Sequence, residues 1–156
     1  MSERWDNYFL GAALHAAGMS KDPSTRVGAV IVGPLREVRS TGFNGFPRGI
    51  ADDARLLDRD TKLGIIVHAE MNAIMAAARI GVPLDGCTLY VVAMDDTGAV
   101  WGGSPCTRCS VHIIQAGITQ VVSRPKKSAP LRWRADMAHA EAILREAGVT
   151  YREVVR

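Results

Sequence analysis

The stretch IIVHAEMNAI, residues 65–74, places two ionisable side chains in an otherwise apolar segment. Its aliphatic residues are typical of a protein core, whereas His68 and Glu70 stand two positions apart within it. Burying ionisable groups costs free energy unless they are paired or bind a metal ion. The two side chains therefore need a partner or a chemical role.

A second motif, SPCTRCS at residues 104–110, contains a Cys-x-x-Cys pair formed by Cys106 and Cys109. Each motif alone is a weak signal, because Cys-x-x-Cys also occurs in redox proteins and in structural zinc sites. A lone histidine in an apolar helix is usually a core residue. Taken together, the two motifs form the pattern H-x-E followed by P-C-x-x-C, which is the signature of zinc deaminases that act on nucleobases.

The chemistry of zinc supports the same interpretation. Zinc prefers four tetrahedral ligands, and a catalytic site leaves one position for water. His68, Cys106 and Cys109 supply three ligands, and both motifs are predicted at the N-terminal ends of helices, where the helix dipole favours thiolate. Glu70 is then free to move a proton between water and a ring nitrogen. Since no fourth protein ligand is evident, we expect one catalytic zinc per chain rather than a structural zinc or a redox pair.

The rest of the chain alternates between helical and strand-like patterns. Helices are predicted at residues 4–17, 68–81, 106–117 and 134–148, strands at 26–33, 37–43, 87–94, 118–123 and 149–155, a short exposed helix at 52–60, and a loop or small hairpin at 95–104. This alternation predicts one α/β layered domain that spans residues 1–156.

Composition places the chain among ordinary globular proteins, with 156 residues, 47% hydrophobic and 22% charged. No apolar run is long enough for a transmembrane helix, and the start of the sequence lacks an export signal. The three cysteines do not form a disulfide framework. We therefore expect a cytoplasmic protein. The net charge of +3 is mild. The one basic run, residues 123–134, is either a solvated loop or a surface that attracts phosphate, and the modest charge argues against nucleic acid as a partner.

Four stretches, in order, resemble the cytidine deaminase-like superfamily and its deoxycytidylate (dCMP) deaminase branch. They are KDPSTRVGAVIV at residues 21–32, GFNGFPRG at 42–49, VHAEMNAI at 67–74 and PCTRC at 105–109. The resemblance implies a three-layer α-β-α domain with a central mixed sheet of about five strands. It also implies hydrolysis of dCMP to dUMP and ammonia, and a homo-oligomer that is a hexamer or smaller.

The resemblance further implies roles for individual residues. The zinc ligands are matched by His68, Cys106 and Cys109, and the proton shuttle is matched by Glu70. Substrate binding is implied for Arg26, Asn44, Ala69 and Ser104. Binding of a regulatory nucleotide, with Mg²⁺ as an accompanying ion, is implied for Asn44, Gly45 and Arg48. Without the resemblance, Arg26 and Arg48 are equally consistent with exposed arginines, and Asn44 with a turn residue in a left-handed conformation.

Two features depart from the dCMP branch and leave the substrate open. Residues 94–104 form an expanded segment before the Pro-Cys, and Trp133 stands in a region where the branch often has tyrosines. Trp101 and Trp133 are candidates to stack on a base. The alternatives are a deaminase of a nucleoside, a free base or a modified cytosine, an RNA-editing deaminase, and a non-catalytic zinc module, which Glu70 argues against. For a substrate phosphate, the basic candidates besides Arg26 are Lys126, Lys127, Arg132 and Arg134.

Overall fold

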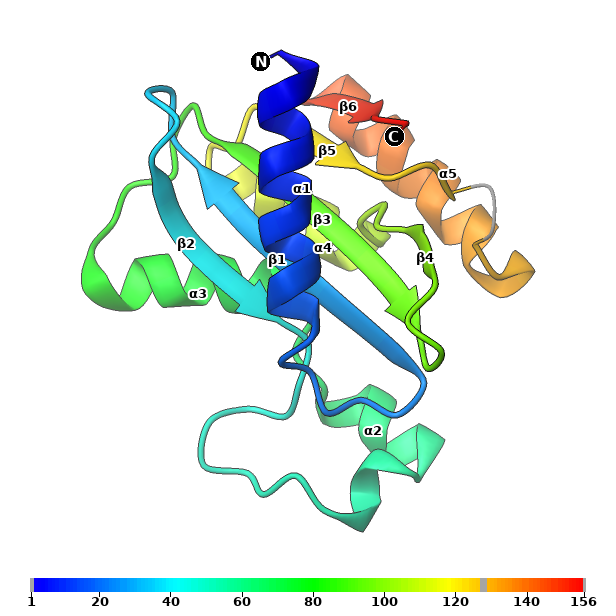
Figure 1. Cartoon of the computed structure of the whole chain (residues 1–156). Coiled ribbons are helices and arrows are strands. Elements are labelled where there is room, and N and C mark those ends of the chain that lie inside the picture. Colours follow the sequence, from blue (N-terminus) through cyan, green and yellow to red (C-terminus); the bar gives the residue numbers. More distant parts are fainter. Residues whose placement is uncertain (1, 127–128, 156) are drawn as a thin grey trace.

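The computed structural model describes residues 2–126 and 129–155, and Lys127 of the basic run lies outside this range. A mixed β-sheet forms its centre (Figure 1). In chain order the elements are α1 (Glu3–Ala17), β1 (Thr25–Val32), β2 (Val38–Phe43), the 3-10 helix η1 (Ala54–Leu56), α2 (Arg59–Ile65), α3 (Ala69–Ile80), β3 (Thr88–Asp95), β4 (Val100–Gly102), α4 (Thr107–Gln115), β5 (Gln120–Ser123), α5 (Leu131–Glu146) and β6 (Thr150–Glu153).

The strands run in the order β2-β1-β3-β5-β6, and β4 pairs with β3 outside this path. β1 pairs antiparallel with both β2 and β3, whereas β3, β5 and β6 are parallel. The central strand β3 is buried along seven of its eight residues, which agrees with its β-branched and apolar sequence. The expected mixed sheet of about five strands is therefore confirmed. Residues 95–104, expected as a loop or a small hairpin, contain β4, which pairs antiparallel with β3.

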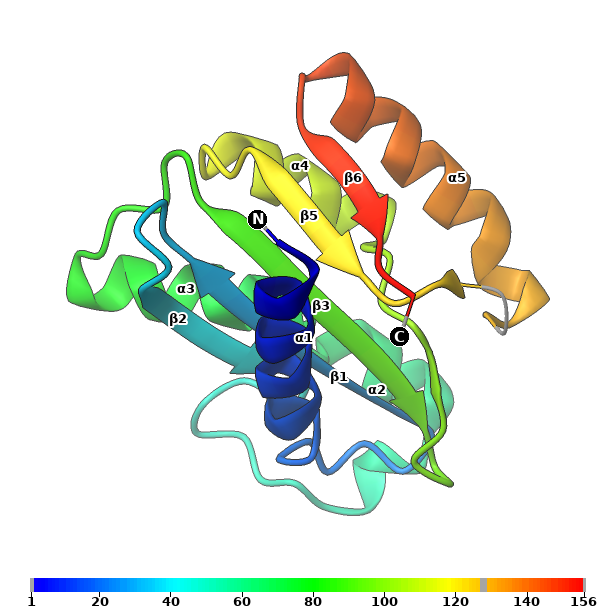
Figure 2. The same cartoon turned by 45° about the horizontal axis from the view of Figure 1, so that its top comes forward.

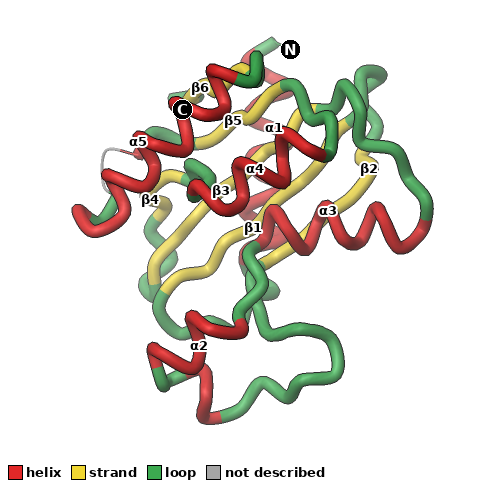
Figure 3. The backbone as a smooth tube through the Cα atoms, turned by 180° about the vertical axis from the view of Figure 1, so that it is seen from behind, coloured by secondary structure: helices red, strands yellow, loops and turns green. Residues whose placement is uncertain are grey.

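Helices cover both faces of the sheet. α1 crosses one face, and α3, α4 and α5 lie on the other (Figures 1 and 3). Each face has its own apolar core. One is built around Phe9, Leu10 and Tyr90 beneath α1, and the other joins apolar residues of α3 and α4 to the sheet, such as Ala73 and Ile113. The three-layer arrangement expected from the resemblance is confirmed.

Close packing fixes the position of α3 on the sheet. Gly42 in β2 faces the backbone of the first turns of α3, and a Cβ at this position would collide with the backbone of Ala69 and Ala73. Glycine thus allows the helix to approach the strand closely. Ser40 in the same strand donates a hydrogen bond from Oγ to the carbonyl of Ala73 at 2.6 Å. The start of α3, where His68 and Glu70 lie, is held firmly against β2.

Two helices differ from the sequence prediction. The short helix expected at 52–60 is divided into η1 and α2, and α2 continues to Ile65, inside the opening stretch. α5 starts at Leu131 rather than at residue 134, directly after Pro130, whose ring is compatible with the position before a helix. α5 lies beside α4 (Figure 2), so its early start brings Arg132 and Trp133 close to the N-terminal end of α4, where Cys106 lies. No helix within the described residues is both long and apolar enough to cross a membrane.

Candidate active site

Two helix N-termini bring the predicted zinc ligands together. His68 is the N-cap residue of α3, and Cys106 is the N-cap of α4, as the sequence predicted. The His68 Nδ1 atom lies 3.5 Å from Cys106 Sγ and 3.4 Å from Cys109 Sγ. All three ligand atoms lie within 4.8 Å of one another, and the described residues contain no other such group of three potential ligands.

This donor set fits a zinc ion. Zinc bonds of ~2.0–2.3 Å to nitrogen and sulfur at tetrahedral angles place two ligand atoms about 3.5 Å apart. The observed nitrogen–sulfur distances of 3.5 and 3.4 Å match that separation. Two thiols and one imidazole are also the ligand types that zinc prefers, and three protein ligands leave a position free for water or substrate.

The ligand cluster holds charge even without an ion. A hydrogen bond from Cys109, and further ones from His68 and the Cys109 backbone, lower the pKa of Cys106 to about 4. The hydrogen bond with Cys106 raises the pKa of His68 to about 9. Cys109 retains its proton, because its hydrogen bond to Cys106 and its burial both raise its pKa. Binding a metal ion therefore releases protons from the cluster.

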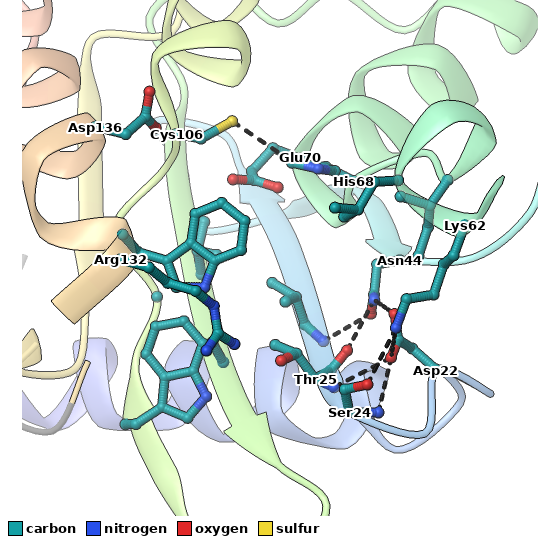
Figure 4. A pocket seen from close by; sticks show the side chains of 18 of the residues that line it. Asp22, Ser24, Thr25, Asn44, Lys62, His68, Glu70, Cys106, Arg132 and Asp136 are labelled. Atoms are coloured by element: carbon teal, nitrogen blue, oxygen red, sulfur yellow. Dashed lines mark hydrogen bonds and ion pairs between the residues drawn. The ribbon is translucent and has the colours of Figure 1, made fainter. Parts of the chain in front are cut away.

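Glu70 is the second residue of α3 and lies in its first turn, beside the ligand cluster. Its side chain points into a pocket next to His68 and Cys106 (Figure 4), and only 4% of the residue is exposed. Burial is the main reason that the pKa of Glu70 is raised above its ordinary value. A buried carboxyl with a raised pKa can hold a proton and pass it on, which is the property needed in a general acid and base.

The pocket has a volume of about 400 Å³, within the range of small-molecule sites. His68, Glu70 and Cys106 line one end. The walls come from the loop before β1, from α2, from β3 and β4, and from the start of α5. Trp101 and Trp133, the two tryptophans singled out in the sequence, both line it. The pocket thus combines a metal-ligand cluster, a carboxyl and an aromatic wall.

A polar network forms another part of the pocket wall. Lys62 from α2 donates hydrogen bonds to Asp22 Oδ1 at 3.0 Å and to Ser24 Oγ at 3.1 Å. The Asn44 carboxamide accepts from the Val27 N–H at 2.7 Å and donates to the Thr25 carbonyl at 2.9 Å. Asn44 does not adopt the left-handed backbone considered for it. It lines the pocket, and a contact with a sugar stays a prediction.

Arg26 lies away from the pocket. Its neighbours Thr25 and Val27 line the pocket, and Arg26 does not. Side chains alternate between the two faces of a strand, so Arg26 is directed to the opposite side of β1. Its guanidinium lies near the carbonyls of Asp95 and Asp96, at 3.4 and 3.5 Å. Within this chain the structure does not bring Arg26 to the candidate site.

Among the described residues of the basic run, one cation lines the pocket. Arg132 lines it, whereas Lys126 and Arg134 do not. Lys126 instead pairs with Glu141 and lies 3.8 Å from Glu153. The Arg134 Nε donates to the carbonyl of Ala129 at 3.3 Å.

The remaining predicted residues are distributed around the site. Ser104 lines the pocket, and its buried Oγ makes no hydrogen bond within the described residues. Ala69 is fully buried at the start of α3. Gly45 pairs through both backbone groups with Val67, and Arg48 is exposed in the turn that follows. The roles of these residues in binding substrate or a regulatory nucleotide stay predictions.

Sequence reasoning missed Asp22, Lys62 and Asp136. Asp136 on α5 accepts a hydrogen bond from the Thr107 N–H at 3.0 Å, and so holds the first turn of α4 beside Cys106. These residues are separated from their partners by 29 to 40 positions. A lysine predicted in or next to an exposed helix and an aspartate in an amphipathic helix look like solvated surface residues, so no local pattern identifies them.

Comparison with known protein families agrees with this geometry. Residues 3–124 match the model of the cytidine and deoxycytidylate deaminase zinc-binding region. The human deoxycytidylate deaminase is 35% identical over 158 residues, which cover 97% of this chain and 80% of the human protein. The mouse deoxycytidylate deaminase is 35% identical over 155 residues, with coverages of 96% and 79%.

Solved structures share the fold. The dCMP deaminase from the cyanophage S-TIM5, in complex with dCMP and dUMP, superimposes with a TM-score of 0.78. The match covers 98% of both chains at 24% identity. At this level of identity the likeness concerns the fold.

Proposed function

Since the chain belongs to the cytidine and deoxycytidylate deaminase family, we propose that it catalyses the hydrolysis of dCMP to dUMP and ammonia. The observation that carries this proposal is the joining of three features in one pocket: the cluster of His68, Cys106 and Cys109, the buried Glu70, and enough volume for a small nucleotide. The human and mouse relatives, which are matched over 80% and 79% of their own lengths, are deoxycytidylate deaminases.

Zinc held by His68, Cys106 and Cys109 would act as a Lewis acid that makes water a stronger nucleophile at neutral pH. Glu70 accepts a proton from the attacking water and delivers it to the ring nitrogen N3 as the oxygen bonds to C4. It then assists transfer of a proton to the exocyclic amine, which leaves as ammonia while the carbonyl forms. The burial of Glu70 suits this role, because its raised pKa allows it to carry the proton between the two steps.

Aromatic and apolar groups support binding of the base. Trp101, Trp133 and Met137 line the pocket together with Val91 and Ala93 from the central strand. Flat apolar surfaces favour a pyrimidine ring and exclude bulk water from the reacting atoms.

The assembly and the regulation are further parts of the proposal. We expect a homo-oligomer, a hexamer or smaller, and binding of a regulatory nucleotide with Mg²⁺ near Asn44, Gly45 and Arg48. The support is the resemblance of the stretch at residues 42–49 to the corresponding part of the dCMP branch. Sedimentation with and without dCTP and Mg²⁺ tests both expectations.

A screen for ammonia release tests the function. The zinc-loaded protein is offered dCMP, dCTP, deoxycytidine, cytosine, 5-methyl-dCMP, guanine and adenosine in RNA. We expect the highest kcat/KM with dCMP. A clear preference for a nucleoside, a free base or RNA would contradict the proposal and would identify the substrate class instead.

A further inference from the structure

Within the described part of the chain, three lysine or arginine side chains line the pocket: Arg59, Lys62 and Arg132. Under the proposed function, the substrate carries a 5′-phosphate with up to two negative charges, which needs a cation that is not already neutralised. The surroundings of the three side chains differ enough to choose between them.

Lys62 is already paired. Its ammonium lies 3.0 Å from the Asp22 carboxylate, and both side chains are more than 90% buried. A phosphate placed against Lys62 would also meet the negative charge of Asp22, and removing Lys62 from this pair would leave a buried carboxylate uncompensated. Lys62 therefore serves the wall of the pocket and is a poor receptor for a second anion.

Arg59 has acidic neighbours. It is the first residue of α2, between the N-cap Asp58 and Asp60 of the first turn. These two carboxylates reduce the positive potential around its guanidinium. Arg59 and Arg132 are both exposed, so the difference between them lies in their charged neighbours.

Arg132 is in a different environment. It lies in the first turn of α5, which contains no acidic residue and whose N-terminal end carries the positive side of the helix dipole. Within the described residues Arg132 makes no ion pair. Asp136, one turn further, directs its carboxylate to the Thr107 N–H at 3.0 Å. The guanidinium of Arg132 is thus available for a ligand.

The placement of Arg132 suits the far end of a nucleotide. Its side chain extends into the pocket, on the side away from His68 (Figure 4). Its guanidinium carbon lies 5.7 Å from the centroid of the Trp133 ring, and Trp101 lines the same region. Ser24 and Thr25 contribute to the wall across the pocket. A base held at the Glu70 end leaves a phosphate to be bound by these groups.

We propose that Arg132 binds the 5′-phosphate of the substrate and thereby selects the nucleotide over the nucleoside. This inference rests on the proposed function and assigns one residue to it. Arg132 lies beyond residue 124, where the match to the family model ends. The guanidinium binds phosphate through charge-assisted hydrogen bonds, in the two-pronged geometry that arginine favours.

The test compares Arg132→Ala with wild type on dCMP and on deoxycytidine. We expect kcat/KM for dCMP to fall about 10- to 100-fold, mostly through KM, because the phosphate contact is made before and during the reaction. Activity on deoxycytidine should stay within about 2-fold, since the nucleoside lacks the phosphate. The kcat/KM of Arg132→Lys for dCMP should lie between the values of wild type and Arg132→Ala, because lysine keeps the charge and loses the paired hydrogen bonds.

Two matched variants and one binding measurement make the test specific. Arg134→Ala removes an arginine from the same helix that does not line the pocket, and it should leave both activities unchanged. Arg59→Ala removes the competing pocket cation. Calorimetry on the zinc-loaded proteins should show that Arg132→Ala weakens binding of dUMP about 10- to 100-fold and of deoxyuridine hardly at all.

Three results would overturn the assignment: an unchanged dCMP activity in Arg132→Ala, an equal loss on dCMP and deoxycytidine, or a nucleotide-specific loss in Arg59→Ala alone. In each of these cases, wild-type activity on dCMP would still support the proposed function, and only the role of Arg132 would be wrong. A wild-type enzyme without activity on dCMP removes the proposed function itself, and the calorimetric comparison of dUMP with deoxyuridine still reports whether Arg132 binds phosphate.

Discussion

Glu70 combines burial, a raised pKa and a position next to a metal-ligand cluster. Replacing Glu70 by Gln keeps the size and shape of the side chain and removes its ability to accept a proton. We expect kcat to fall at least ~10²-fold, the usual size of a general acid and base contribution. Zinc content, measured by elemental analysis, should stay at one per chain, because Glu70 is not one of the three ligands. Near-normal turnover in Glu70→Gln would mean that the carboxyl has only a structural role.

At the residue scale, spacing within each motif is local, and this allowed the sequence to predict that Cys106 and Cys109 lie together and that Glu70 lies close to His68. The pairing of His68 with the cysteines spans 38 and 41 positions and came from the combined motif pattern. Residues three apart at a helix start lie on the same turn, so Cys106 and Cys109 had to lie together. Arg26 was harder to place, because its role depends on which face of β1 it occupies. The alternation of Thr25, Arg26 and Val27 gives that information only once the pocket side of the sheet is known.

At the scale of elements, a partly buried ion pair ties α1 to the edge strand β6. Arg152 in β6 donates to both carboxylate oxygens of Asp6, at 2.8 and 2.6 Å, and the Tyr90 hydroxyl in β3 donates to Asp6 Oδ1 at 2.9 Å. Burial would raise the pKa of Asp6, but the hydrogen bonds from Arg152 and Tyr90 together outweigh it and hold the pKa below the ordinary value for an aspartate.

Asp6→Asn should therefore lower the free energy of unfolding at pH 7 by roughly 1.5–3 kcal/mol, the range for hydrogen bonds to charged groups. The contribution of Asp6 is fully present above the unfolded-state pKa and is lost as the pH falls through the lower folded-state pKa. The difference between wild type and variant should thus shrink below about pH 4, as measured by urea unfolding at several pH values. Asp52→Asn, which breaks an exposed pair with Lys21, should cost less than about 1 kcal/mol. A pH-independent difference would contradict this account.

Element boundaries were predictable where a residue type enforces them. Gly81 adopts a left-handed conformation and ends α3, as expected from the sequence. The start of α5 was predicted too late, because Leu131, Arg132 and Trp133 were assigned to the basic run on the basis of charge. The helix includes them, since nothing in these three residues disfavours a helix and Pro130 fits before its first turn.

At the scale of the whole molecule, the candidate site is assembled from parts that are distant in the sequence. The metal-ligand cluster joins α3 to α4, and the pocket adds groups from the loop before β1, from α2 and from α5. Such long-range contacts, for example between Lys62 and Asp22, depend on the sheet order and cannot be read from a local pattern. The fold class could be predicted, whereas the walls of the pocket required the structure.

Because α3 and α4 lie in different parts of the chain, an ion bound between them should stabilise the whole domain. Binding to the folded state alone stabilises by about 4 kcal/mol when the free ligand is at 1,000 times its Kd. For a chain of this size that corresponds to a fall of roughly 10 °C in Tm when a strong chelator removes the ion. Differential scanning calorimetry with and without chelator measures this shift. Cys106→Ala should start from a low Tm and respond little to chelator, whereas Glu70→Gln should respond as wild type does. An equal response of Cys106→Ala and wild type would place the stabilising metal elsewhere in the molecule.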